Sequence, residues 1–249
     1  MTLEAVAAWI RDSANLLVLT GAGISTDSGI PDFRGPDGVW TKDPKAERLS
    51  NIRYYMSDPQ VRVESWRQRL DHPAWRASPN RGHLALVELE RKGHLQALVT
   101  QNIDGLHLMA GSAPAITVEI HGTMRDVVCM SCGERAPMER ALERVRAGED
   151  DPPCRSCGGV LKSATISFGQ NLVAGDLARA QAAAEACDFC LAVGSSLGVY
   201  PAAALPSIAQ AAGARLVIIN GEPTPFDRAA DEVFHEPIGE VLPALVELV

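Results

Sequence analysis

The 249-residue sequence has no long apolar segment. A membrane-spanning helix needs roughly 20 consecutive apolar residues, and no run here approaches that length. The first part of the chain also lacks the basic region that opens a signal peptide, and it carries Glu4 and Asp12 instead. We therefore expect a cytoplasmic protein in which residues 3–12 form an amphipathic helix and residues 16–20 form a buried strand.

Positive charge is scarce as well. The chain has 31 acidic residues against 23 Lys and Arg, which gives a formal net charge of -8 and a pI near 5.3. The average field of such a protein repels nucleic acid and anionic membranes, so we expect neither as a direct partner. In a cytosol, the six cysteines are expected to be thiols or metal ligands rather than disulfides.

One glycine of the usual dinucleotide-binding fingerprint is missing too. The strand 16–20 runs into GAGISTDSGIPDFRG (21–35), where Thr26 occupies the place of the third glycine. An ordinary dehydrogenase interpretation is therefore weak. Gly21 and Gly23 still predict a tight turn that brings bare backbone N–H groups against a phosphate, with a following helix adding its positive N-terminal dipole.

The second half of this stretch predicts a loop that covers a ligand. Asp32 could bind an amide, Phe33 could shield a reactive carbon from water, and Arg34 could contact a phosphate through two hydrogen bonds. The alternative is a solvated turn that contains a salt bridge.

Polar residues follow several further predicted strands. We expect strands at 95–100, 116–120, 189–193 and 215–220, and parallel sheets present ligand groups at the carboxyl ends of their strands. The residues at those ends are Gln101, Asn102, Asp104, His121, Gly194, Ser195, Ser196, Asn220 and Glu222. A purely structural Asx turn remains an alternative for residues 101–104.

A histidine at such a strand end suits a general base, because imidazole holds or releases a proton near neutral pH. His121 is therefore a candidate catalytic residue. The other histidines receive a structural interpretation; they are His72, His83, His94, His107 and His235.

Two Cys-x2-Cys pairs, separated by 21 residues, predict a metal site. Each pair can form a knuckle, and four thiolates together give tetrahedral zinc with no open coordination position, which is typical of a structural ion. Free thiols or disulfides are the alternatives. The four ligands are Cys129, Cys132, Cys154 and Cys157. Cys187 and Cys190 have the same spacing without a second pair, and we interpret them as buried core residues.

Residues 36–80 lose the strand pattern and gain proline, charged residues and three tryptophans, which indicates a small helical module. The module could form one wall of the ligand cleft. Trp66 and Arg69 are three residues apart on one face of a helix within it. One interpretation places Trp66 in the core of the module beside a surface arginine; the other follows from the family resemblance given below. The next helix, 84–92, is expected to face the sheet through Leu84, Val87 and Leu89.

These features predict an α/β fold: a Rossmann-like parallel sheet with an inserted helical module and a four-cysteine zinc-binding module. We expect one domain over 1–249, with residues 164–168 returning to the main sheet. Its nucleotide-binding part comprises 1–35, 81–124 and 164–249, its helical module 36–80, and its zinc-binding module 125–163.

The set of motifs resembles the signature of the sirtuins, which are NAD-dependent protein deacylases. Its members, in the family's order, are 21–35, TQNIDGLH (100–107), EIHGT (119–123), the two cysteine pairs, GSSL (194–197) and INGEP (219–223). The resemblance is to bacterial sirtuins, with some similarity to the mitochondrial lipoamidase-type branch. It implies that NAD is consumed as a co-substrate and that one structural zinc ion is bound per chain.

The resemblance also implies site roles. His121 would be the general base, with Asn102 and Asp104 completing the catalytic group. The implied NAD contacts are Gly21, Ala22, Gly23, Ser25, Asp32, Phe33, Arg34, Gln101, Asn102, Asp104, Gly194, Ser195, Ser196, Asn220 and Glu222.

An acylated-lysine peptide is expected to bind as an added strand, a mode that uses backbone hydrogen bonds. By resemblance, the peptide would lie between Phe168-Gly169 and Val199-Tyr200. Trp66 and Arg69 stand where sirtuins that remove acidic acyl groups carry Tyr-x-x-Arg. Because the tyrosine is missing, the acyl preference stays open.

The implied reaction transfers the acyl group from lysine to ADP-ribose and releases nicotinamide. One alternative is protein ADP-ribosyl transfer, in which a protein side chain attacks the ribose carbon. Another is an NAD-binding sensor without useful turnover.

Overall fold

The computed structural model describes residues 2–32 and 46–249. Its central strand, β1 (Leu16–Thr20), is buried along its whole length. β1 pairs in parallel with β2 (Leu95–Thr100) on one side and with β7 (Phe189–Val193) on the other. The three expected strands in these regions are confirmed.

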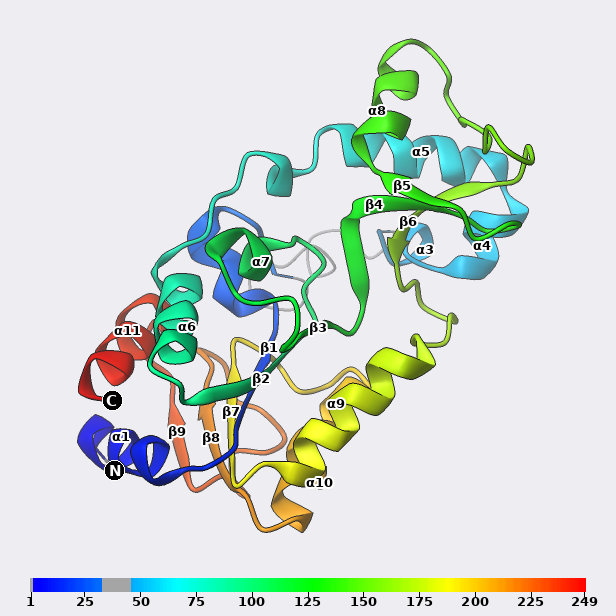
Figure 1. Cartoon of the computed structure of the whole chain (residues 1–249). Coiled ribbons are helices and arrows are strands. Elements are labelled where there is room, and N and C mark those ends of the chain that lie inside the picture. Colours follow the sequence, from blue (N-terminus) through cyan, green and yellow to red (C-terminus); the bar gives the residue numbers. More distant parts are fainter. Residues whose placement is uncertain (1, 33–45) are drawn as a thin grey trace.

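The main sheet has six parallel strands in the order β3-β2-β1-β7-β8-β9 (Figure 1). After β1, the next strands along the chain, β2 and β3, are added on one side; after β7, the strands β8 and β9 are added on the other. The strand order therefore reverses between β1 and β7. Such a reversal opens a crevice at the carboxyl ends of two neighbouring strands, where α/β proteins bind ligands. The remaining strands are β3 (Thr117–Glu119), β8 (Arg215–Ile219) and β9 (Glu232–Phe234).

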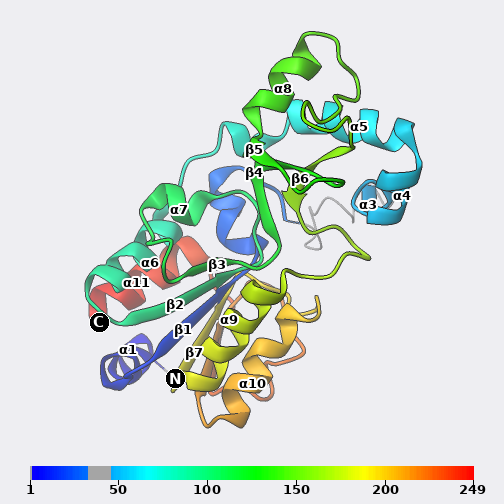
Figure 2. The ribbon, with the colours of Figure 1, turned by 45° about the vertical axis from the view of Figure 1, so that its right-hand side comes forward.

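Helices cover both faces of the sheet (Figures 1 and 2). Side chains alternate along β1, so Leu16 and Val18 join the core on one face, while Leu17 and Leu19 join the core on the other. The first face is covered by α1 (Leu3–Asp12), α6 (Arg81–Arg91) and α11 (Ile238–Leu248). The second face is covered by α9 (Ala174–Ala186) and α10 (Leu205–Ala211). A short 3-10 helix, η3 (Ala202–Ala204), precedes α10.

The helix expected at 84–92 begins three residues earlier, at Arg81, directly after its N-cap Asn80. Its buried face consists of Gly82, His83, Ala85, Leu86 and Leu89. The prediction that Leu84 faces the sheet is wrong, since 52% of Leu84 is exposed. The buried face is rotated about the helix axis relative to the predicted one. The reason is that it includes a histidine and two small residues, which a search for large apolar residues does not select.

A smaller lobe lies beyond the carboxyl edge of the sheet (Figure 2). Its three-stranded antiparallel sheet has the order β5-β4-β6. The elements of this lobe are α3 (Ala46–Leu49), α4 (Ile52–Ser57), α5 (Pro59–Leu70), η2 (Pro73–Trp75), β4 (Gly122–Cys129), β5 (Arg135–Pro137), α8 (Glu139–Arg146) and β6 (Leu161–Thr165).

The helical and cysteine modules share one core within this lobe. Trp66 packs with apolar residues of β4, β6 and α8. The Tyr55 hydroxyl donates to the Leu161 carbonyl at 2.8 Å, and Arg62 pairs with Asp151 at 2.7 Å. Neither module therefore stands alone where the structure describes them.

Residues 164–168 do not return to the main sheet, so that prediction is wrong. β6 ends at Thr165 and pairs antiparallel with β4 in the small sheet. Phe168 forms an isolated bridge with Asn51 of the helical module. The stretch therefore connects the small lobe to the rest of the chain without adding a strand to the large one.

No helix within residues 2–32 and 46–249 is both long and apolar enough to span a membrane.

Candidate active site and metal centre

Two loops interlock at the point where the strand order reverses. The Gly21 N–H donates to the Val193 carbonyl at 3.0 Å, and the Gly23 N–H donates to the Gly194 carbonyl at 2.8 Å. A Cβ atom on Gly21 would lie 2.7 Å from the Gly194 oxygen. Gly194 itself has φ +64°, and its Cβ would lie 2.4 Å from the Ile24 nitrogen. Only glycines allow the loops to approach this closely.

These bonds account for the N–H groups of Gly21 and Gly23 themselves. Both donors are already used to join the loops after β1 and β7. The helix that follows is not an α-helix but a 3-10 helix, η1 (Ala22–Ser28). The two glycines therefore bring the loops after β1 and β7 together, and their contacts with NAD remain predictions.

Replacing Gly23 with alanine should therefore damage the site. The new Cβ would lie 2.8 Å from the Gly194 Cα, and backbone at that distance must move. We expect a loss of about 1–3 kcal/mol in the free energy of unfolding, measured by urea titration, and at least about tenfold weaker NAD binding. Gly175→Ala is the matched control, since its Cβ would meet nothing within 4 Å. Wild-type behaviour of Gly23→Ala would contradict the interlock.

Amide side chains after β2 connect the two loops further. Gln101 donates from Nε2 to the Ser195 hydroxyl at 2.8 Å. Asn102 is buried and donates from Nδ2 to the Gly21 carbonyl at 3.0 Å and to the Ser25 hydroxyl at 3.2 Å. The structure thus brings together five predicted site residues from three separate parts of the sequence.

Asp104 completes this buried cluster. Its Oδ2 accepts from the Ser25 hydroxyl at 2.8 Å, and its Oδ1 accepts from the Leu106 N–H at 2.9 Å, at the start of α7 (Leu106–Ala110). The second of these bonds is the Asx turn weighed as an alternative, so Asp104 has a structural role and a place in the site at the same time.

Two histidines that received a structural interpretation border the same cluster. His83 Nδ1 accepts from the Asn80 N–H at 3.3 Å, which leaves Nε2 as the ring donor, 3.5 Å from the Ser25 hydroxyl. His107 Nε2 lies 2.9 Å from the Thr20 hydroxyl, and the His83 and His107 rings are tilted by 58° with their centroids 4.9 Å apart. Burial lowers the pKa of His83 to about 4 and that of His107 to about 3, so both are neutral at pH 7.

Asn80, which sequence reasoning did not select, orders this corner of the site. Its Oδ1 caps α6, and its Nδ2 donates to the Ile24 carbonyl at 2.8 Å and the Ser28 hydroxyl at 2.9 Å. The spacing Asn-x-x-His at a helix start is the available signal, because it forms a reciprocal capping box.

His121 lies between the two lobes, directly after β3 and before β4. Its backbone carbonyl accepts from the Ile166 N–H at 2.7 Å, and the following Gly122 has φ +71°. A Cβ on Gly122 would lie 2.1 Å from the Ala164 oxygen, so the close contact of β4 with β6 requires glycine.

The His121 ring is half-buried, and its Nδ1 lies 3.0 Å from the Gln101 carbonyl oxygen. A carbonyl only accepts, so Nδ1 carries the proton and Nε2 keeps a lone pair. Burial lowers the pKa of His121 below 6.5, and the bond to Gln101 raises it to a lesser extent. The ring is therefore neutral at pH 7, with one nitrogen able to accept a proton.

The loop after β8 carries the predicted residues Asn220 and Glu222, and β8 lies next to β7 in the main sheet. Asn220 donates from Nδ2 to the Glu222 carbonyl at 2.6 Å, and its backbone N–H donates to the Phe234 carbonyl at 2.9 Å. Asn220 is buried, whereas Glu222 and Ser196 are exposed. Their predicted contacts with a ribose remain predictions.

Other predicted contacts are placed less fully. Phe33 and Arg34 lie outside the described residues, and Asp32 is the last described residue before them. Phe168 is half-buried and Gly169 is exposed beside the helical module. Tyr200 is 70% exposed, next to the half-buried Val199. Two segments are thus accessible where the peptide is expected.

Trp66 does not line an acyl pocket in this structure. Its side chain is 0% exposed and packs inside the core shared by the helical and cysteine modules. The alternative interpretation, core packing, is therefore the one the structure supports. Arg69, on the next turn of α5, is half-buried, and its role in acyl recognition remains a prediction.

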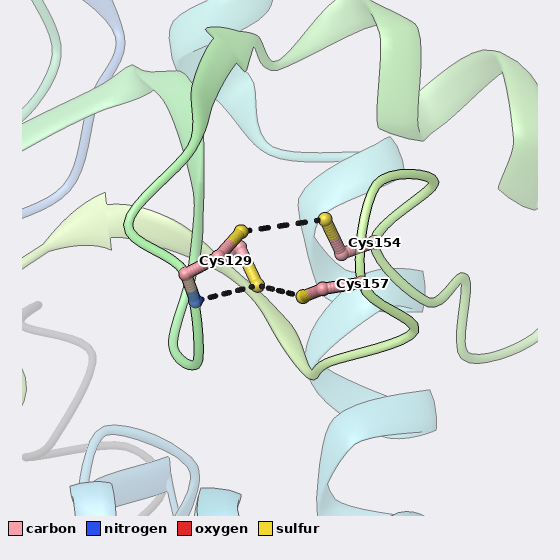
Figure 3. A group of neighbouring side chains, drawn as sticks. Cys129, Cys154 and Cys157 are labelled. Carbon is pink, nitrogen blue, oxygen red and sulfur yellow. Dashed lines mark hydrogen bonds between the residues drawn. The ribbon is translucent and has the colours of Figure 1, made fainter.

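The four predicted ligand cysteines converge in the small lobe. Their sulfur atoms all lie within 4.8 Å of one another. Cys154 and Cys157 come from one loop and point toward the loop that carries Cys129 (Figure 3). The Sγ atoms of Cys129 and Cys157 are 3.5 Å apart, and those of Cys132 and Cys154 are 3.8 Å apart. Zinc–sulfur bonds of about 2.3 Å in a tetrahedron require sulfur separations of roughly 3.8 Å, so the arrangement fits zinc.

Both cysteine pairs have the same backbone conformation. The Cys129 N–H donates to the Glu134 carbonyl and the Cys154 N–H to the Gly159 carbonyl, at 2.9 and 2.8 Å. Gly133 and Gly158 follow the second cysteine of each pair with φ near +75° and +72°. This repeat is the knuckle geometry expected for a closed structural site. Cys187 and Cys190 pack in the main core, as predicted.

The main sheet is Rossmann-like, with polar residues and a neutral histidine near the point where its strand order reverses. The small lobe adds a four-cysteine centre. These features are typical of a nucleotide-binding enzyme with a structural metal ion. Comparisons with known proteins narrow this class. Residues 21–201 match the Sir2 family, and this chain belongs to that family, the sirtuins.

Individual relatives agree with this assignment. The chain is 54% identical over 229 residues to "NAD-dependent protein deacetylase 2" of Streptomyces coelicolor, covering 92% of this chain and 95% of that protein. A solved structure of Sir2 with a p53 peptide and NAD+ has a TM-score of 0.89 and 34% identity, with 99% and 98% of the two chains covered. A Sir2 structure with a deacetylated p53 peptide and 3'-O-acetyl ADP-ribose has a TM-score of 0.91 at the same identity and coverage.

Proposed function

We propose that this protein is an NAD-dependent protein deacetylase that removes acetyl and related acyl groups from lysine side chains. The observation that carries the proposal is the neutral His121, which lies between the main sheet and the small lobe and whose Nε2 has no hydrogen-bond partner within residues 2–32 and 46–249. The Streptomyces relative and the Sir2 complexes described above support it.

NAD would lie across the crevice between β1 and β7. The nicotinamide end would contact the buried cluster of Ser25, Asn102 and Asp104, and the adenosine end would reach the loop at Asn220. Gln101 and Ser195, joined by a hydrogen bond, would lie between these ends. NAD supplies a cationic leaving group, nicotinamide, and a ribose carbon to which the acyl oxygen can bond.

His121 would act as a general base toward a ribose hydroxyl. The bond from Nδ1–H to the Gln101 carbonyl fixes the tautomer and the ring orientation, so Nε2 is the atom that takes the proton. The products would be free lysine, nicotinamide and O-acyl-ADP-ribose.

The pH dependence of the reaction follows from the state of His121. A general base works only when deprotonated, and burial lowers its pKa below 6.5. The rate should therefore be insensitive to His121 above neutrality and fall only as the pH drops through a value under 6.5. We expect the acid limb of kcat/KM, measured with acetylated peptide between pH 5 and 8, to have its midpoint below 6.5. A midpoint above 7 would contradict this state of His121.

The substrate is proposed to be an acylated-lysine segment of a protein. The half-buried Phe168 and Val199 belong to the two segments expected to flank the peptide backbone. Such pairing uses main-chain hydrogen bonds and tolerates many sequences. We also propose a cytosolic location, which suits a protein in which none of the six cysteines forms a disulfide.

The test is a mass-spectrometric screen of the purified protein with NAD and one lysine peptide carrying acetyl, propionyl, succinyl, lipoyl or long-chain acyl groups. Loss of an acyl group together with matching O-acyl-ADP-ribose supports the proposal and identifies the preferred group. ADP-ribose attached to protein without acyl loss would favour the transferase alternative, and absence of nicotinamide release would favour a sensor.

A further inference from the structure

Asp104 is fixed through its backbone as well as through its carboxylate. The Nε–H of Arg125 donates to the Asp104 carbonyl oxygen at 2.8 Å. Arg125 lies on β4, four residues after His121, and therefore comes from the small lobe. Nothing in the proposed reaction yet uses this arginine.

The same guanidinium also binds the helical module. Its Nη2 donates to the Ala74 carbonyl at 3.1 Å, and its central carbon lies 5.1 Å from the centre of the Trp75 ring. Both residues belong to η2. Among the described residues, no carboxylate lies within ion-pair distance of Arg125, so its hydrogen bonds go to backbone carbonyls and to the Met109 sulfur at 3.2 Å.

The stem of Arg125 packs against Gly105. A Cβ atom on Gly105 would lie 3.1 Å from the Arg125 Cγ and 3.3 Å from its Nε, and Gly105 has φ +74°. The turn after Asp104 is therefore shaped by a glycine and covered by the arginine that bonds its carbonyl. The planar guanidinium group of arginine can donate to two carbonyls from different segments at once. The ammonium group of lysine is a single point of charge and serves two such partners less well.

We propose that Arg125 is a positioning residue that holds Asp104 against Ser25 and ties the nicotinamide end of the NAD site to the helical module. This inference rests on the proposed function, because Asp104 is placed at the nicotinamide end only by that proposal. Arg125 touches no reacting atom itself; it acts through the Asp104 turn.

The variant Arg125→Met tests the role, because methionine keeps much of the apolar stem and removes every donor. We expect nicotinamide release from NAD, measured with acetylated peptide at saturation, to fall about tenfold to a hundredfold. The Kd for ADP-ribose, which lacks nicotinamide, should stay within about twofold. A purely structural role would instead weaken ADP-ribose binding and nicotinamide release together.

Arg125→Lys should give an intermediate rate, and it decides the question if Arg125→Met does not fold. Arg135→Met is the matched control, since Arg135 lies on the neighbouring β5 in an exposed pair with Asp126. Its rate and its ADP-ribose affinity should equal those of the wild type.

Nicotinamide release at the wild-type rate in Arg125→Met, or equal losses in release and ADP-ribose affinity, would overturn the inference. A wild-type protein that releases no nicotinamide would instead overturn the proposed function, so the two failures are distinguishable.

Discussion

Substitution of His121 by alanine is expected to reduce deacetylation by roughly 10²–10⁴-fold, the usual contribution of a general base. The ring is held by one hydrogen bond, from Nδ1 to the Gln101 carbonyl, and its other nitrogen is free to take a proton. NAD binding should remain, because the Gln101 and Asn102 side chains bond to Ser195, Gly21 and Ser25, whereas the His121 ring, among the described residues, bonds only to the backbone carbonyl of Gln101. Initial rates of nicotinamide and O-acyl-ADP-ribose formation, with calorimetric NAD affinity, measure both effects.

A second substitution separates chemistry from orientation. In His121→Asn, the side-chain amide can still donate to the Gln101 carbonyl but offers no basic nitrogen, so its activity should be as low as that of alanine. His94→Ala is the control, since His94 lies before β2, at the opposite end of the strand from the crevice. Full turnover by His121→Asn would remove His121 from the role of base.

Loss of one zinc ligand should have the second large effect. In Cys157→Ser, the exchange is nearly isosteric and the residue is exposed, so the change acts on metal binding rather than on packing. Structural zinc binds with about 10–16 kcal/mol in small zinc modules, and much of that energy is folding energy. We expect no retained zinc, a loss of roughly 5 kcal/mol or more in the free energy of unfolding, and a Tm lower by about 10–20 °C.

Activity should be lost with the zinc ion, although no cysteine lies in the crevice. β4 runs from Gly122 to Cys129, so unfolding of the cysteine module removes the support of His121. Zinc content by elemental analysis, thermal unfolding and turnover test this chain of effects. Cys187→Ser is the control, because Cys187 packs in the main core, away from the four ligand cysteines. This variant should retain one zinc ion per chain. An active and zinc-free Cys157→Ser would contradict a structural role of the metal.

Much of the fold could be predicted because its signals are local. Apolar runs such as 16–20 and 189–193 have the length and composition of strands covered on both faces, and both are strands here. The two Cys-x2-Cys pairs fix the metal site through the short reach of each knuckle. Polar residues after the strands meet at one edge because parallel strands end on the same side.

The errors have a common cause. A pattern within a single helix misplaces Leu84 and leaves two interpretations open for Trp66, because the neighbours that decide burial come from other parts of the chain. The packing of Gly21 and Gly23 against the loop after β7 could not be predicted for the same reason, since Gly194, which takes up one donor, lies more than 170 residues further along.

Composition and spacing over a few residues are enough to predict the central strands of the main sheet, the metal ligands and the candidate base. The groups that surround Asp104 depend instead on how distant elements pack together. Ser25, His83 and Arg125 meet there from three separate elements, and their hydrogen bonds depend on distances of about 3 Å that no spacing along the chain specifies.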